Sequence, residues 1–521
     1  ETKSSYIIRL REYDRRCGWF DKIFTISVAN TSPRLKWDNS TTAGTQPASG
    51  TWGTDNFWSY NGTSLLAWPG TEHSAEFAGA DGTYTITVNG TQNADSVIFT
   101  NRGYTLSNGT LVVPNLVANA KGTIASAVSG SFSKSGPDTL VLSGNNNTAS
   151  NYTHLAGTVV ATSANALGNG SVIMNGSGSI VLNNGVSMSN ALTISACDPG
   201  MGLGALSSGI NSNATWSGAL NMNATCATGG QITGTTNGTG SLTLSGPIHM
   251  GGTATRVEQR DGLVIYSGSG TATRFELTKG TSRLGANNGL PTSAIWQQSH
   301  AGYSSELDLN GFNQTFPMVY SAIAAASIRN TLATTVLTLN GSGDTTYAGS
   351  ITGNIAIAKS GSGRQTFSGT NTYLGPTTIT GGTLALKSAT ALGATSSIAA
   401  TGGGSLDLGG QTVSTSPNLT ISGNGVSAAG ALTNSGTTDG VFSGLVTLGS
   451  SATIGGSGGK LLVTNTGTIN GSGFNLALGG AQGGSLYGVV AKGTGGLTKK
   501  DAGTWILLGA NTYSGPTTIT A

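Results

Sequence analysis

The stretch NTYLGPTTIT at residues 371–380 recurs as NTYSGPTTIT at residues 511–520, 140 positions along the chain and identical at nine of ten residues. Chance does not produce such a match, so both stretches are copies of one repeating unit. Each copy follows a lysine and a short predicted strand: KSGSGRQTFSG begins at Lys359 and KDAGTWILLG begins at Lys500. A degenerate third copy, KSGPDTLVLSG, begins at Lys134. The chain is therefore expected to be built from internal repeats.

A second element follows the first and makes the repeating unit longer. GGTLALKSATALG at residues 381–393, followed by SLDLGG at 405–410, parallels LAGTVVATSANALG at 155–168. It also parallels RLGANNGLP at 283–291, followed by ELDLNG at 306–311. The unit thus spans several turns of chain.

Short alternating runs closed by Gly, Asn, Ser or Thr fill the chain after residue 37, as at residues 84–88, 241–244 and 336–339. Alternation over four to six residues between turn formers is typical of half-buried strands. Residues 7–13 and 322–328 are the weak candidates for helical turns. The pattern predicts an all-β protein.

Strand and tight turn alternate at roughly 20 residues per circuit with no crossover helix, which indicates a coil of parallel strands, a β-helix or β-solenoid of ~20 to 25 rungs. Leu384, Leu386, Leu406 and Leu408 are expected to stack inward. Thr, Ser and Asn, which are compatible with strands and uncharged, would point outward.

Composition excludes several classes of protein. Gly, Thr, Ser and Asn make up 259 of the 521 residues, charged residues 9% and apolar residues 37%, with a net charge of +3. Apolar surface is available for burial, so the chain is not expected to be disordered. Residues 1–36 hold eight basic and four acidic side chains, and beyond them no basic stripe exists, so nucleic acid is not an expected partner. No apolar run is long enough to span a bilayer as a helix, so no transmembrane helix is expected.

The chain is expected to divide into an extension or docking arm at residues 1–36, a tryptophan-rich capping module at 37–110, and β-helix repeats at 111–521. Five of the eight tryptophans lie between the N-terminus and Trp68. Two interpretations are open: a cap that covers the apolar end of the first rung, or a platform for sugar rings. The residues concerned are Trp37, Trp52, Trp58 and Trp68.

The pattern of Lys, a short strand, Gly, NTYxGxTTI and GTL resembles the passenger-associated, autotransporter-type β-strand repeat of large bacterial surface proteins. The resemblance covers residues 359–410 and 499–521, and more weakly 134–182 and 262–311. It implies a right-handed parallel β-helix, export across the bacterial envelope and display on the cell surface or outside the cell. The sequence stops partway through a repeat, so we expect a longer polypeptide or a last rung completed by another chain. The candidate assembly residues are Thr517, Thr518, Ile519, Thr520 and Ala521.

Acidic residues are the candidates for polysaccharide cleavage, because β-helices that cleave polysaccharides use clustered carboxylates. Glu306 and Asp308 share one face of a predicted strand. The dense charged cluster of the body contains Arg256, Glu258, Arg260 and Asp261. For both groups local ion pairing, or decoration of the outer face of the coils, is the favoured interpretation, so no catalytic residue is predicted.

Other candidate sites are few. The four histidines are far apart in the sequence and are expected in solvent-facing loops, so no metal site and no cofactor is predicted. Cys197 and Cys226 are candidates for a disulfide, the alternative being two small buried hydrophobes, and Cys17 would stay unpaired.

The predicted function is that of a non-enzymatic, extracellular structural β-solenoid: a surface stalk, an adhesin or a self-assembling fibre subunit whose partner is another copy of the chain. Two alternatives stay open. A carbohydrate-active β-helix, similar to a polysaccharide lyase or hydrolase, requires a groove in which carboxylates from several rungs converge. A carbohydrate-binding adhesin that contacts surface glycans requires exposed, coplanar indole rings.

Overall fold

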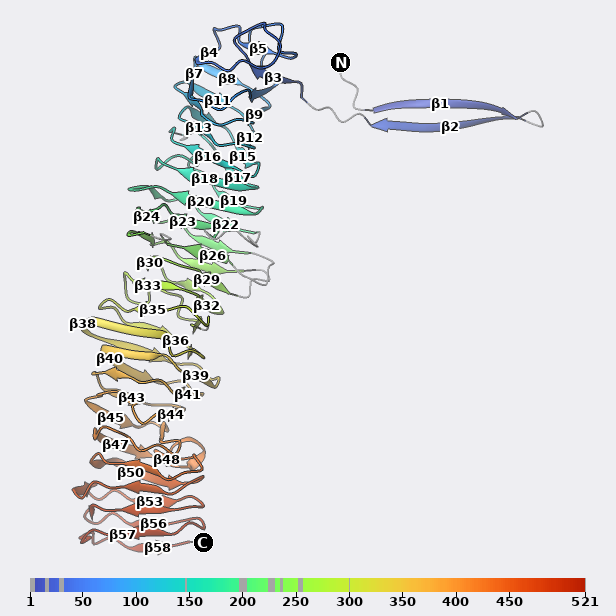
Figure 1. The fold of residues 1–521 in the computed structure, drawn as a ribbon. Coiled ribbons are helices and arrows are strands. Elements are labelled where there is room, and N and C mark those ends of the chain that lie inside the picture. Colours follow the sequence, from blue (N-terminus) through green and yellow to red (C-terminus); the bar gives the residue numbers. More distant parts are fainter. Residues whose placement is uncertain are drawn as a thin grey trace. The chain divides into compact units, whose positions relative to one another are not determined.

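The structure is a computed structural model that describes residues 5–14, 18–27, 32–145, 148–195, 204–223, 230–234, 238–251, 256–298 and 300–520, with the backbone alone for the first two ranges. These residues form strands β1 to β58 and one 3-10 turn, η1 (Val426–Ala428) (Figure 1). The chain divides into two compact units, residues 1–150 and 151–521. Within the described residues no helix is long and apolar enough to cross a bilayer.

The first unit begins with an antiparallel hairpin. β1 (Ser5–Asp14) pairs with β2 (Gly18–Ser27) over its whole length. Residues 7–13 lie inside β1, so the expectation of a helical turn there was wrong. Pairing with β2 satisfies the backbone of a segment whose own helical periodicity is weak.

The rest of the first unit is wound into coils of three strands, and strands of successive coils pair in parallel, as in β7–β10–β13, β8–β11–β14 and β9–β12–β15. The exception is β5, which pairs antiparallel with β3. Thr85 pairs with Thr105, and Thr105 pairs with Thr123, so the advance of the chain per coil agrees with the predicted circuit. The strands of these coils are β3 (Arg34–Trp37), β4 (Gly50–Trp52), β5 (Trp58–Ser59), β6 (Ser74–Phe77), β7 (Tyr84–Val88), β8 (Thr91–Asn93), β9 (Ser96–Phe99), β10 (Tyr104–Ser107), β11 (Thr110–Val112), β12 (Asn115–Ala118), β13 (Gly122–Ile124), β14 (Ala127–Ser129), β15 (Phe132–Ser135) and β16 (Thr139–Leu142).

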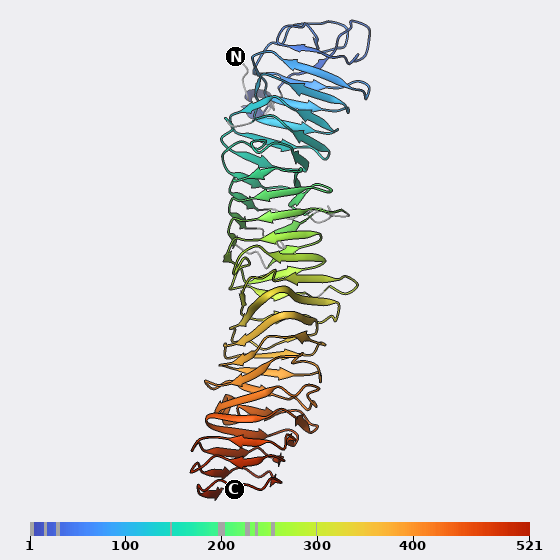
Figure 2. The same cartoon turned by 90° about the vertical axis from the view of Figure 1, so that its left-hand side faces the viewer.

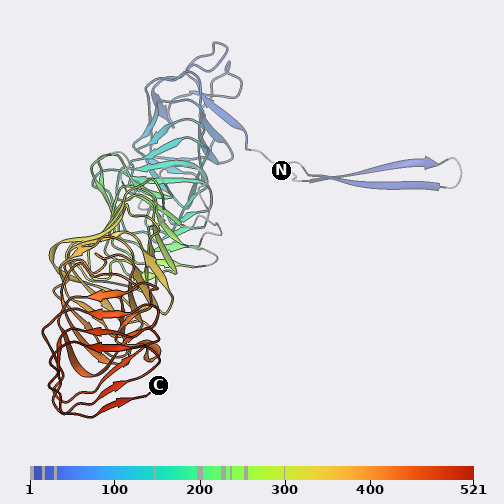
Figure 3. The same ribbon diagram turned by 60° about the horizontal axis from the view of Figure 1, so that its bottom comes forward.

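The second unit continues the same parallel pairing, and its strands lie one on another in Figures 2 and 3. One ladder consists of β18 (Gly157–Ala161), β20 (Gly178–Leu182), β23 (Leu206–Ser208), β26 (Gly230–Thr233), β29 (Val257–Gln259), β32 (Arg274–Leu277), β34 (Ile295–Gln297) and β37 (Val319–Tyr320). Another includes β30 (Leu263–Tyr266), β33 (Gly280–Leu284), β35 (Ser305–Asp308), β38 (Ala326–Leu339) and β40 (Ser350–Lys359). Ala326 to Ile328 begin β38 and pair with β35, so the helical turn expected at residues 322–328 was also wrong.

Apolar side chains stack along the interior of the second unit. Phe275, Trp296 and Phe316 from successive coils are stacked with ring centroids 5.5 and 5.6 Å apart. Leu384 in β44 (Thr383–Leu386) pairs with Leu406 in β46 (Ser405–Asp407), and both are buried. Leu386 and Leu408 are buried as well, so the four predicted core leucines are confirmed.

The fold class predicted from the repeats is confirmed: the chain is an all-β parallel β-solenoid of about 20 turns. The strands inside each sheet are hydrogen-bonded to the coil on either side, which leaves the side chains to decide function.

Candidate functional site

The tryptophans of the first unit pack against one another under the first coils. Trp37, Trp52 and Trp58 are fully buried and Trp68 is half-buried. Neighbouring indoles meet edge to face or tilted, at angles from 50° to 83°. The three buried rings lie 5.8 to 6.2 Å from Phe77, an inward residue of β6. Three fully buried rings and a half-buried fourth, none of them coplanar with its neighbours, offer no flat surface to a sugar, so this arrangement favours the cap.

The candidate disulfide lies outside the described residues. Cys17, Cys197 and Cys226 all fall in gaps between the described ranges. The pairing of Cys197 with Cys226 therefore stays a prediction.

A lysine of the first repeat copy points into the interior of its coil. Lys134 in β15 lies beside Leu116 of β12 in the inward-facing column and is fully buried. Its Nζ donates hydrogen bonds to the backbone carbonyls of Gly136 and Asp138, both at 2.7 Å. The ammonium thus holds the turn that follows its own strand.

The second copy repeats this arrangement. Lys359, 2% exposed, lies in β40 between Leu339 of β38 and Ile379 of β43 (Thr377–Ile379). Its Nζ donates to the carbonyl of Gly361 and, at 3.2 Å, to that of Gly381. A charged group in an apolar column is tolerated because backbone oxygens solvate it.

The third copy corrects the sequence alignment by one residue. Lys499 in β56 (Leu497–Lys499) pairs with Ile519 as Lys359 pairs with Ile379, and its Nζ donates to the carbonyl of Asp501, two residues on. Lys500, which the sequence analysis placed at this position, instead donates to the Ala428 carbonyl at 2.9 Å. Two adjacent lysines look equivalent in sequence, and the inward direction of one side chain distinguishes them.

Burial changes the proton affinity of these lysines. Loss of hydration lowers the pKa of Lys134 to about 8, with the nearby Asp138 carboxylate opposing the change. Loss of hydration likewise lowers the pKa of Lys359 to about 8, against the opposing charge of Asp344. At neutral pH both are therefore mostly protonated, at a cost to the stability of the fold.

The predicted charged cluster is present, and it includes two residues that the sequence analysis missed. Arg256 contacts Glu258 at 3.6 Å and Glu276 at 3.1 Å, and Arg260 contacts Glu258 at 3.8 Å. His300 lies 3.3 Å from Glu276. The carboxylates are 6% and 4% exposed. Glu276 lies one coil away from Glu258, so a search for nearby charges in the sequence could not join them.

The predicted pair Glu306 and Asp308 points to one side of β35, and both bind the same arginine. Nε of Arg329 lies 2.7 Å from Glu306, and its Nη2 lies 3.1 Å from Asp308. Nε of Arg283 lies 2.9 Å from Asp308. Local ion pairing, the interpretation favoured from the sequence, is confirmed for this pair.

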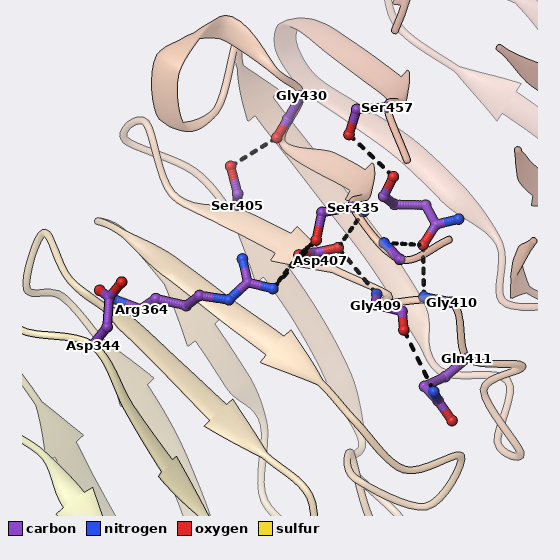
Figure 4. Close-up of polar contacts among 12 residues, drawn as sticks. Asp344, Arg364, Ser405, Asp407, Gly409, Gly410, Gln411, Gly430, Ser435 and Ser457 are labelled. Atoms are coloured by element: carbon purple, nitrogen blue, oxygen red, sulfur yellow. Dashed lines mark hydrogen bonds and ion pairs between the residues drawn. The ribbon is translucent and has the colours of Figure 1, made fainter. Parts of the chain in front are cut away.

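Asp407 forms a third carboxylate centre, which the sequence analysis did not identify (Figure 4). It is fully buried, and its Oδ2 accepts hydrogen bonds at 2.5 Å from Arg364 and from the Ser435 hydroxyl. Its Oδ1 accepts from the amides of Gly409 and Ser435 at 3.0 and 2.9 Å. Asp308 accepts from the amide two residues on in the same way. The sequence signal that could have identified Asp407 is the Leu-Asp-Leu triplet that it shares with Asp308. In both triplets the aspartate accepts from the amide of a turn and binds an arginine.

Three stretches of the chain match the model of the passenger-associated-transport repeat, at residues 132–161, 357–386 and 497–521. The chain carries passenger-associated-transport repeats. The inward lysines Lys134, Lys359 and Lys499 are each the third residue of their match. The matches overlap three of the four stretches in which the sequence resembled this repeat, so the resemblance is confirmed.

One region is also similar to a curated protein. Over 106 residues, 20% of this chain, it is 34% identical to proteins named Serine protease EspP from Escherichia coli and from Escherichia coli O157:H7. The aligned region spans 8% of the length of that relative. No solved structure matches the chain.

The third passenger-associated-transport repeat contains the predicted assembly residues. Thr517 to Ile519 form β58, which pairs in parallel with β56, and residues 517–520 are exposed. Ile519 is 74% exposed, and on the adjacent coil Ile506 and Leu508 are 52% and 56% exposed. Ala521 lies outside the described residues.

Two further residues from the sequence analysis are held by local partners. Asp261, from the predicted charged cluster, lies 2.8 Å from Nζ of Lys279. His154 is fully buried between the Tyr152 hydroxyl at 2.8 Å and the Gly157 carbonyl at 3.0 Å. The expectation of a solvent-facing histidine was wrong here, because the alternation of β17 (Tyr152–His154) directs His154 inward.

Proposed function

We propose that the chain is a passenger segment of a bacterial autotransporter-type protein, secreted to the cell surface or the medium. There it acts as a non-catalytic structural solenoid, as a stalk or an adhesin. The observation that carries the proposal is the passenger-associated-transport repeat, whose three copies place an equivalent lysine in the coil. The family implies export, and the structural role follows from the stacked coils.

The solenoid suits a structural role for a physical reason. Parallel strands bond to the coil on each side and their inward residues form continuous apolar columns, so bending or extension breaks many interactions together. The low content of charged residues, 9%, leaves an outer surface dominated by Thr, Ser and Asn.

The absence of catalysis is part of the proposal. Among the described residues Glu306, Asp308 and Asp407 each bind an arginine, which favours structural ion pairs over acid and base catalysis. Incubating the purified chain with polysaccharides and measuring new reducing ends tests this. If the parent chain releases new reducing ends and this release is lost when Glu258 and Glu276 are changed to glutamine, the proposal of a non-catalytic chain is contradicted.

Secretion is tested on the producing bacterium. Antibodies raised against residues 357–410 should label intact cells or detect the protein in the medium, and external protease should remove the label. A periplasmic protein, detected only after permeabilisation, is the control. Labelling that requires permeabilised cells and absence from the medium would refute export.

A second candidate function is a fibre subunit, in which β58 (paired with β56 in this chain) pairs with residues 1–36 of a second copy by strand addition. Electron microscopy of the chain with and without residues 1–36 tests it. The full chain should form filaments and the truncated chain should not, whereas equal filaments from both would exclude this contact.

A further inference from the structure

One column of the second unit carries large polar side chains over five coils in succession. Parallel pairing places Gln231, Glu258, Glu276, Gln297 and Tyr320 side by side on five successive coils, from β26 to β37. We call these five residues the polar stripe. Four of the side chains end in a planar amide or carboxylate group, and the fifth, that of Tyr320, ends in a hydroxyl on an aromatic ring.

Another column of the unit carries small residues. It lies on the 22-stranded sheet and runs through Ala358, Thr378, Ala399 and Thr420. The solenoid therefore does not need large polar side chains on its outer face. Like charges opposite each other on paired strands destabilise a sheet. The neighbouring carboxylates of Glu258 and Glu276 therefore lower the stability of the sheet, and Arg256 offsets this effect by contacting both.

A hollow of about 400 Å³ adjoins the stripe. It crosses β32, β34, β37 and β39 (Thr345–Tyr347), so it spans three spacings of ~4.8 Å. Tyr320 and Met318 are half-buried in its lining, and Arg274 and Asp344 are exposed. Its lining consists of Arg274, Ile295, Gln297, Met318, Tyr320, Asp344 and Thr345.

The chemistry of this surface favours a neutral ligand. Arg256, Arg260 and Arg274 are matched in number by Glu258, Glu276 and Asp344, so no net charge attracts a phosphate, a nucleic acid or an anionic lipid. β32 and β34 are paired on both sides. β37 is the last strand of its sheet, and the adjoining Ser321 is bonded to β39 through the Thr346 carbonyl and the Ala348 amide, so an extended peptide finds little free backbone edge.

We propose that the hollow, with the accessible end of the polar stripe at Gln297 and Tyr320, binds a neutral, linear, β-linked oligosaccharide lying along the stack of coils. Gln231, Glu258 and Glu276, only 4%, 4% and 3% exposed, support this surface from beneath. Gln297, Arg274 and Asp344 supply planar hydrogen-bonding groups to hydroxyls, and the ring of Tyr320 supplies a face for the C–H groups of a sugar. The spacing of the coils is close to the length of one hexose in an extended β-1,4-linked chain, and because adjacent hexoses are flipped, equivalent hydroxyls meet every second coil. The site deepens the adhesin role and requires no catalytic step.

The purified full chain tests the proposal, with cellohexaose and chitohexaose as probes in isothermal titration calorimetry. One or both should bind, and Tyr320→Ala should weaken binding at least tenfold. Tyr487→Ala, which removes an exposed tyrosine elsewhere in the same unit, is the matched control and should bind like the parent chain. Circular dichroism and the midpoint of thermal unfolding establish that both variants are folded.

Three results would overturn the proposal: no heat from either hexasaccharide at millimolar concentration, equal binding by Tyr320→Ala, or binding confined to heparin or polygalacturonate. If Tyr320→Ala does not fold, Gln297→Ala replaces it with the same expectation. Because the assay uses purified protein, its failure leaves secretion untouched, and a failure of surface labelling leaves this binding site untouched.

Discussion

Replacing Lys359 with methionine is expected to remove a step in the pH dependence of stability. Burial lowers the pKa of this lysine to about 8 in the folded chain, whereas lysine in an unfolded chain titrates near ~10.4. Between these values the unfolded chain binds more protons, so the free energy of unfolding rises with pH. Integrated from pH 8 to 10, one such lysine contributes about 2 kcal/mol of the rise. The variant should lose that increment.

Buried tyrosines set the upper limit of the pH range in which the effect of Lys359 can be measured. Burial raises the pKa of Tyr347 and of Tyr373 in the folded chain. Above their unfolded pKa of ~10 the unfolded chain releases protons first, so stability falls again. The effect of the lysine is therefore read between pH 8 and 10.

Hydrogen exchange measured by mass spectrometry on peptides from residues 357–386 gives the free energy of opening of these coils. Exchange rates are corrected for the intrinsic effect of pH. Lys387→Met, at an exposed lysine in the same region, is the matched control and should keep the full rise. Methionine leaves the carbonyls of Gly361 and Gly381 without the donor that Lys359 supplies, so the stability of the variant also changes at every pH. The comparison therefore rests on the slope of the opening free energy against pH. Equal slopes in the parent chain and in Lys359→Met would refute the reasoning.

Three other substitutions test the packing. Phe77→Ala should destabilise the first coils by about 3–5 kcal/mol, because three tryptophans lose their shared contact, and hydrogen exchange of residues 34–118 would register it. Asp407→Ala should cost about 2–3 kcal/mol, because Arg364 and buried amides lose their acceptor, and urea unfolding would measure it. Gly353→Ala should lower the thermal midpoint far more than Gly302→Ala: both have a positive φ, +83° and +86°, but only at Gly353 does an added Cβ fall 2.0 Å from a backbone oxygen.

Much of the fold could be predicted because its signal is repeated. Alternation and turn formers recur in every coil, so Leu384 and Leu406 were placed in the core correctly although each run is short. Isolated segments did worse. Residues 322–328 were a candidate helical turn because so short a stretch carries little periodicity, and pairing with β35 decided their state.

The amino-acid pattern alone was enough to establish the repeating unit, the parallel coil and the inward leucines, because these depend on spacings within one strand or between copies of one motif. Which charges meet across coils required the folded chain. Glu258 and Glu276 lie on neighbouring coils and Arg364 and Asp407 lie two coils apart, and each pair meets because coils of variable length are stacked in register. The direction of Lys499 rather than Lys500 also depends on that register, which is set by the packing of whole columns.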